Sequence, residues 1–171
     1  MAEFISKVFR MPSRGKPISI IDVSGVPSEI TSTVVAVLRR LVFDFAIWAR
    51  EEKTRPILLV CEEAHRYVPN EKNADGSSVG KILSRIAKEG RKYGISLGLI
   101  TQRPSDLAEG VLSQCGTIIS MRLNNDLDQQ FVKAAMPEGA RGFLDSIPAL
   151  RNREAIICGE GVSIPMRVAF D

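Results

Sequence analysis

Short apolar runs rich in β-branched residues recur along this chain, and helical stretches separate the first four of them. Continuous apolar runs that alternate with helices are typical of an α/β fold with a mostly parallel sheet, covered by helices on both faces. The last two runs flank a glycine-containing turn, which predicts an antiparallel hairpin at the sheet edge. The expected strands are residues 18–23, 57–61, 95–100, 117–121, 155–158 and 162–170.

The longest expected helix begins near Pro27 and carries apolar residues at steps of three or four positions, which predicts a stripe that faces the core. Additional apolar residues widen this stripe, so the helix is either buried on several sides or contacts a further domain or subunit. The expected core stripe is Ile30, Val34, Leu38, Leu41, Phe45 and Trp48, and the residues that widen it are Val35, Val37, Val42 and Ala46.

Three more helices are expected. The first follows a polar loop at residues 69–78, and Gly94 ends it in a left-handed cap. Its buried side is expected to contain Ile82, Leu83, Ile86 and Tyr93. The other two fit residues 106–113, with Ser105 as the N-cap, and residues 126–135, with Asn124 or Asn125 as the N-cap.

The composition suits one globular domain, because 44% of the 171 residues are hydrophobic and 25% are charged. A net charge of +3 permits nucleic-acid binding without indicating it. Cys61, Cys115 and Cys158 have no metal-ligand spacing, and their odd number indicates a reducing compartment and a packing role. Arg39 and Arg40 break the longest apolar stretch, so no membrane span and a cytoplasmic location are expected.

Two adjacent carboxylates, Glu62 and Glu63, directly follow the apolar run 57–61. In nucleotide hydrolases this arrangement, the Walker B element, lets one carboxylate hold Mg²⁺ or its water while the next orients and deprotonates the attacking water. The simpler interpretation is that both acids are ordinary solvent-exposed residues at the end of a strand. A di-iron site built from Glu62 and His65 is excluded, because it needs two Glu-x-x-His motifs and the chain has a single histidine.

Gln102 follows a second apolar run, 95–100. Ligands of open α/β sheets bind outside the carboxyl ends of the strands, so Glu62, Glu63 and Gln102 are expected to meet in one crevice. There the Gln102 amide can sense a γ-phosphate or water, although ordinary turn chemistry also explains this residue. Arg91 lies in a basic cluster at the end of a helix, where favourable interaction with the helix dipole is the simpler explanation.

Residues 76–82, GSSVGKI, resemble a phosphate-binding P-loop but do not fit its pattern G-x-x-x-x-G-K-[ST]. The spacing between the glycines is one residue short. Ile82 has no hydroxyl for Mg²⁺, and a polar loop precedes Gly76 where a strand is required. No other Gly-Lys-Ser/Thr occurs in the chain, so the nucleotide-binding loop is absent from it.

In this order, the segments PILLVCEEAHRYVP, RIAKEGRKYGISLGLITQRPSDL and LSQCGTIISMRL closely resemble the C-terminal half of HerA-type DNA-translocating ATPases, relatives of the FtsK motor. The resemblance extends from GKPISIIDVSGVPSE to PALRNREAIICGEGVSIPMRVAF. It implies that residues 1–171 form the C-terminal part of a RecA-like, P-loop NTPase domain of the ASCE type. The N-terminal barrel, the Walker A strand and the P-loop of the family are missing.

The resemblance also implies roles and partners. Glu62 holds Mg²⁺ through water, Glu63 is the general base, Gln102 is the sensor, and Arg91 contacts phosphate within its own subunit or across an interface. HerA-like proteins bind ATP and Mg²⁺, form hexameric rings around duplex DNA, and act with a NurA-type nuclease in DNA-end resection. One departure weakens the metal assignment, because the family's usual first acid is Asp where this chain has Glu62.

Two further classes compete with a translocase ATPase that needs its upstream half. A chain without the P-loop can persist as an oligomerisation or scaffold module without ATPase activity. A DEAH-type RNA helicase is suggested by residues 62–65, EEAH, but the chain has neither the Ser-Ala-Thr motif nor the arginine motif of that family. The RNA helicase interpretation is therefore rejected.

Overall fold

A computed structural model describes residues 7–9, 17–48, 56–70 and 78–171. The described helices are α2 (Ser28–Trp48), α3 (Ser78–Glu89), α4 (Glu109–Leu112), α5 (Asp126–Ala135) and α6 (Arg141–Leu144). The strands are β1 (Ile57–Cys61), β2 (Ile95–Leu99), β3 (Thr117–Ser120), β4 (Glu154–Gly159) and β5 (Met166–Ala169). Short 3₁₀ helices lie between them: η1 (Ala64–Arg66), η3 (Gly90–Tyr93), η4 (Pro104–Asp106), η5 (Glu138–Ala140) and η6 (Ile147–Ala149).

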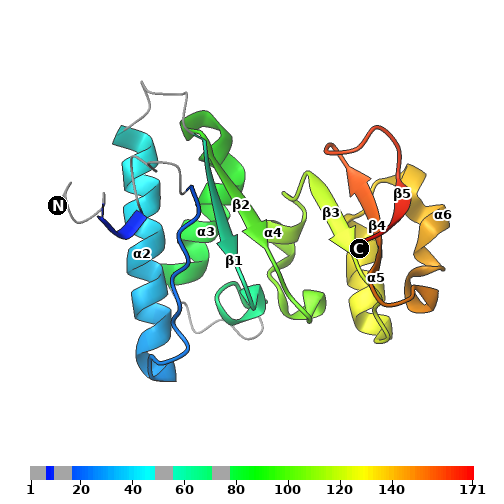
Figure 1. Cartoon of the computed structure of the whole chain (residues 1–171), viewed down its shortest axis with the longest axis horizontal. Coiled ribbons are helices and arrows are strands. Elements are labelled where there is room, and N and C mark those ends of the chain that lie inside the picture. The colour runs from blue at the N-terminus through cyan, green and yellow to red at the C-terminus, as the bar shows by residue number, and fades with distance from the viewer. Residues whose placement is uncertain (1–6, 10–16, 49–55, 71–77) are drawn as a thin grey trace.

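The five strands form two sheets. β1 and β2 are parallel, with Ile57 opposite Ile95 and Cys61 opposite Leu99. β3, β4 and β5 form an antiparallel sheet in that order. Figure 1 shows α2 and α3 beside the parallel pair at one end of the molecule, and β3–β5 with α5 and α6 at the other end. The α/β class and the antiparallel C-terminal hairpin are confirmed, whereas β3 pairs with β4 and not with β2.

Each sheet has its own apolar core. The first joins the parallel pair to α2, α3 and α4, because alternate residues of β1 point to the helices while the others face away. The second lies between α5, η6 and the antiparallel sheet. Buried residues of the first core include Val42, Phe43, Cys61, Leu83, Ile86, Ile95 and Val111, and those of the second include Val132, Met136, Ile147, Leu150, Ile156 and Cys158.

The expected strand at 18–23 is wrong, because this segment has no strand pairing. Its apolar side chains are also exposed, at 74% for Ile18 and 89% for Ile20. A β-branched run favours an extended backbone, but a strand forms only where a neighbouring strand takes up its N–H and C=O groups. Among the described strands, β1 pairs with β2 alone.

The predicted core stripe of α2 is displaced around the helix. The buried residues are Arg39, Val42, Phe43 and Ala46, whereas Trp48 at the end of the expected stripe is 67% exposed. Ile30, the first residue of that stripe, is also exposed. The sequence did not distinguish these faces because apolar residues occur on several sides of the helix, and because Arg39 is buried by stacking.

The expected helix 106–113 is confirmed only for Glu109–Leu112, and its start is wrong. A 3₁₀ turn occupies Pro104–Asp106, Leu107 is extended, and a single helical turn follows at Glu109–Leu112. Burial of the Leu107 side chain accounts for the break, because an extended backbone there carries it into the first core. Ser105 caps no helix with its side chain; its N–H donates to Asp128.

Other expected helix features are confirmed. Asn125 caps α5 by accepting a hydrogen bond from the Leu127 N–H at 2.9 Å. Gly94 ends the α3–η3 segment with a φ of 71°, a left-handed conformation that glycine adopts without strain. Most of the polar loop at 69–78, and the side chains of the P-loop-like segment 76–82, lie outside the described residues.

One side of the parallel pair is bare. Leu58 and Val60 are 65% and 51% exposed on the face opposite α2 and α3. Among the described strands, nothing pairs with the second edge of β2. Parallel sheets are normally covered on both faces, so this unit has the surface of an incomplete sheet. None of the described helices is both long and apolar enough to cross a membrane.

Candidate active site

The ends of β1 and β2 are tied together by the backbone. The Ile100 N–H donates to the Cys61 carbonyl, and the Ala64 N–H donates to the Ile100 carbonyl, both at 2.9 Å. Because the strands are parallel neighbours, the residues that follow them emerge at the same edge of the sheet. The backbone segments that carry the acidic pair and Gln102 therefore emerge at one edge of the sheet.

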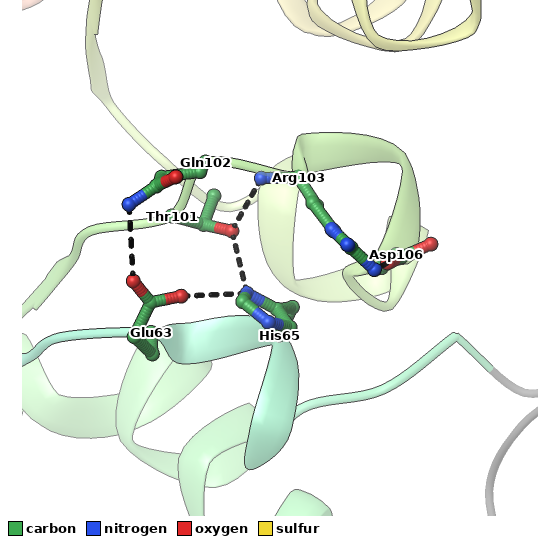
Figure 2. Close-up of polar contacts among 6 residues, drawn as sticks. All are labelled: Glu63, His65, Thr101, Gln102, Arg103 and Asp106. Atoms are coloured by element: carbon green, nitrogen blue, oxygen red, sulfur yellow. Dashed lines mark hydrogen bonds and ion pairs between the residues drawn. The ribbon is translucent and has the colours of Figure 1, made fainter.

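Glu63 contacts residues from both strand ends. Its Oε1 accepts a hydrogen bond from Gln102 Nε2 at 3.3 Å, and its Oε2 lies 3.4 Å from His65 Nδ1 (Figure 2). Its backbone is left-handed, with φ 49° and ψ 45°. This conformation is uncommon for a residue with a side chain and is concentrated at functional sites. The turn aims the carboxylate at Gln102, and 41% of the side chain remains exposed to solvent.

Thr101 is a site residue that the sequence did not single out. Its Oγ1 lies 3.1 Å from His65 Nδ1 and accepts the Arg103 N–H at 3.0 Å. Figure 2 shows Thr101 and His65 between the two chain segments, next to the Glu63–Gln102 contact. The only signal for Thr101 was its place beside Gln102, because the contact depends on how the two turns are aligned.

Glu62 points to no partner among the described residues, and it is exposed. No contact within the described part of the chain occupies its carboxylate oxygens, which suits a site for an ion or water. Within the described part of the chain, no cluster of three or more His, Cys, Asp or Glu side chains is arranged to hold a metal ion.

Arg91 lies at the other end of the parallel pair. It belongs to η3, which enters the amino end of β2, whereas Glu63 and Gln102 follow the carboxyl ends. The Gly94 carbonyl accepts from the Ile57 N–H, at the start of β1. Within one chain, the length of β2 therefore separates the Arg91 backbone from the Glu63–Gln102 pair.

A buried arginine packs against the segment that follows the two acids. The guanidinium of Arg39, on α2, lies 4.5 Å from the ring centroid of Tyr67. Burial lowers the pKa of Arg39, and burial also raises the pKa of the neighbouring Cys61 thiol. Arg39 Nη1 has no hydrogen-bond partner among the described residues. The contact joins α2 to the segment that carries Glu62 and Glu63.

The second core is connected to the Gln102 turn through Asp128. This residue of α5 is 6% exposed, and its Oδ1 accepts the Ser105 N–H at 3.0 Å. The hydrogen bond satisfies a backbone donor at the start of η4, directly after Gln102 and Arg103. The position of the Gln102 turn thus depends on packing in both apolar cores.

The arrangement of strands and helices is shared with solved ATPase structures. The genome-packaging NTPase B204 of Sulfolobus turreted icosahedral virus 2, in complex with AMPPCP, matches 97% of this chain and 90% of its own, with a TM-score of 0.62 and 12% identity. The DNA-packaging ATPase of Sulfolobus turreted icosahedral virus matches 77% of this chain and 60% of its own, with a TM-score of 0.59 and 17% identity. The chain has the α/β fold of these viral packaging ATPases.

Sequence comparison gives the family. The chain is 41% identical over 113 residues to the DNA double-strand break repair helicase HerA of Pyrococcus furiosus. The aligned residues are 66% of this chain and 20% of that protein. It is 30% identical over 162 residues to HerA of Sulfolobus acidocaldarius, covering 90% of the chain and 31% of that protein. No protein-family model matches. The chain is a HerA-type sequence, and it spans between a fifth and a third of these relatives.

Proposed function

We propose that this chain supplies the Walker B acids and the sensor glutamine of a HerA-type ATPase that moves DNA. The observation that carries the proposal is the hydrogen bond between Gln102 and Glu63 across two neighbouring strand ends. A carboxylate and an amide held together at this edge can contact one water or phosphate group between them. ATP and Mg²⁺ are the corresponding substrate and cofactor.

Glu63 acts as the general base in this proposal. A carboxylate that emerges from a strand end can orient water and accept its proton as the γ-phosphoryl group is transferred. Gln102 has both a donor and an acceptor, so it can hold the same water or sense the phosphate. Glu63 is solvent-accessible and already in contact with Gln102, which suits both roles.

Glu62 is the proposed Mg²⁺ residue. Mg²⁺ in ATPases keeps several waters and needs one or two carboxylates besides the phosphates, so a cluster of three protein ligands is not required. The carboxylate of Glu62 is exposed and has no partner among the residues that the structure describes, which fits this requirement. When bound, the ion neutralises charge that develops on the phosphates.

Residues 1–171 are, in this proposal, the C-terminal part of a RecA-like domain. The phosphate-binding loop comes from another segment of a longer polypeptide. The unpaired edge of β2, together with the exposed Leu58 and Val60, offers that segment a sheet edge and an apolar face. Its backbone N–H groups and lysine would hold the β- and γ-phosphates.

The complete protein is proposed to form a hexameric ring around DNA and to act with a NurA-type nuclease in DNA-end processing. The separation of Arg91 from Glu63 supports one feature of such a ring. An exposed arginine at the far end of β2 is better placed to contact a phosphate in a neighbouring copy than one beside Glu63 of its own chain. Arg91 is therefore assigned across a subunit interface.

The test compares two proteins. The first is this chain alone, and the second is this chain joined to the upstream segment of the Pyrococcus furiosus relative, called the joined protein below. Steady-state turnover is measured with ATP, Mg²⁺ and duplex DNA. We expect DNA-stimulated hydrolysis by the joined protein, and weak ATP binding without turnover by the chain alone. Turnover by the chain alone that is lost in Glu63→Gln would contradict the need for a separate phosphate loop.

A further inference from the structure

The ring of His65 lies between the two strand ends of the candidate site. It is the single histidine of the chain, and 18% of its side chain is exposed. Nδ1 faces two oxygens, Thr101 Oγ1 at 3.1 Å and Glu63 Oε2 at 3.4 Å (Figure 2). One ring nitrogen therefore connects the candidate general base to the end of the other strand.

These two contacts restrict which ring nitrogen carries the proton. An ionised carboxylate can only accept, so an unprotonated Nδ1 would place its lone pair against those of Glu63. Thr101 Oγ1 already accepts the Arg103 N–H and has room for one more donor. A proton on Nδ1 is attracted by both oxygens at once. Neutral histidine in water prefers the proton on Nε2, so this network selects the less common tautomer.

We propose that His65 is a positioning residue, whose Nδ1–H, braced by Thr101, holds one carboxylate oxygen of Glu63. Gln102 holds the other oxygen. The inference rests on the proposed role of Glu63 as the general base. With both oxygens contacted, the carboxylate is fixed from two directions even though its side chain is 41% exposed. Fixing a base in the reactive orientation lowers the cost of ordering it during the reaction.

The tautomer can be measured directly on the chain alone. Long-range ¹H–¹⁵N NMR of the ¹⁵N-labelled protein reports which ring nitrogen is protonated, and the single histidine makes the assignment unambiguous. We expect a protonated Nδ1 and an unprotonated Nε2 in the neutral ring. Glu63→Ala should return the ring to the Nε2–H form, whereas Glu63→Gln should keep Nδ1–H because its amide oxygen still accepts. Glu109→Ala, an exposed change on α4, is the matched control.

Two NMR results would overturn the proposal. An Nε2–H tautomer in the unchanged chain would mean that Nδ1 accepts from the Thr101 hydroxyl and gives Glu63 nothing. An Nδ1–H tautomer that survives Glu63→Ala would mean that Thr101 alone holds the ring.

The second arm uses ATP turnover by the joined protein. The side-chain nitrogen of Asn stands near the position of Nδ1, and that of Gln stands near Nε2. We expect His65→Asn to retain turnover and His65→Gln to lose on the order of tenfold in kcat, with similar KM values for ATP. Equal losses in both variants would contradict a role for Nδ1–H. If the unchanged joined protein hydrolyses no ATP, the proposed function fails, and the NMR result still decides the Glu63–His65 contact.

Discussion

At the residue scale, Glu63 combines a left-handed backbone with a carboxylate that contacts two other residues. A left-handed conformation costs a residue with a side chain on the order of 1 kcal/mol or more, so the surrounding structure must enforce it. Hydrogen bonds from Ile100 and Ala64 on either side of the turn provide that constraint. The strained position coincides with the residue for which we propose catalysis.

Glu154 gives a pH-dependent prediction for the antiparallel sheet. The Arg151 N–H and the Arg167 guanidinium both donate to Glu154 Oε2, and they lower the pKa of this carboxyl from its ordinary value of 4.5. A lowered pKa stabilises the fold above pH 4.5, and this contribution is lost as the pH falls through the folded-state pKa. Glu154→Gln should therefore unfold at lower urea concentration at pH 7.

The control for Glu154 is Glu160→Gln, a change at an exposed residue in the turn after β4. The difference between Glu154→Gln and the unchanged chain should shrink below pH 4.5, while Glu160→Gln should match the unchanged chain at every pH. A gap for Glu154→Gln that stayed constant down to pH 2 would show that the charge of Glu154 does not stabilise the hairpin.

At the element scale, Gly90 sets how closely α3 approaches β2. A Cβ at this position would overlap the carbonyl oxygen of Ile95 and lie 3.4 Å from the Ile86 side chain. Gly90→Ala should lower the free energy of unfolding by about 1–3 kcal/mol, the usual effect of overpacking. Gly110→Ala is the matched control, because a Cβ on Gly110 has no atom within 4 Å.

Gly110 lies in α4, where alanine is a better helix former, so Gly110→Ala should be neutral or add up to about 1 kcal/mol. Urea unfolding of both variants measures the difference. Equal stability of Gly90→Ala and Gly110→Ala would mean that α3 and β2 can separate without cost, which contradicts the packing of the first core.

The sequence predicted elements whose boundaries are local. Pro56 and Glu62 bracket an apolar run, and β1 occupies residues 57–61 as expected. Residues 18–23 are also rich in β-branched residues but pair with no described strand, which local composition does not reveal. The break at Leu107 was missed for a related reason, because tertiary burial of that side chain determines it.

The sequence likewise predicted some features of the candidate site and missed others. Adjacent parallel strands were enough to predict that Gln102 and the acidic pair emerge together, although their roles are still proposals. The sequence predicted His65 as a hydrogen-bonding residue beside the site, but not its contact with Thr101, which depends on side-chain orientation in two turns. The order of residues along the chain already indicates that Arg91 and Gln102 lie at opposite ends of β2, because Arg91 precedes this strand and Gln102 follows it.

At the scale of the whole molecule, two cores are joined through the segment between Gln102 and β3 and through Asp128. The unpaired edge belongs to β2, and the exposed Leu58 and Val60 belong to β1. These are the two strands whose ends carry Gln102 and the acidic pair. A phosphate-binding segment that completed this sheet would bring its ligand to the edge where Glu63 and Gln102 already lie. This geometry supports our proposal that hydrolysis requires a longer protein that contains this chain.

The most direct test of the account is ATP turnover by the joined protein with the two acids changed one at a time. Glu63→Gln should keep ATP binding and lose on the order of a hundredfold to ten-thousandfold in kcat, because Gln cannot accept the proton of the attacking water. Glu62→Gln should raise the Mg²⁺ concentration needed for activity, and the control Glu109→Gln should change neither quantity. If Glu63→Gln retained most of its kcat, the assignment of the base would be contradicted, and if neither acid mattered the Walker B interpretation itself would fail.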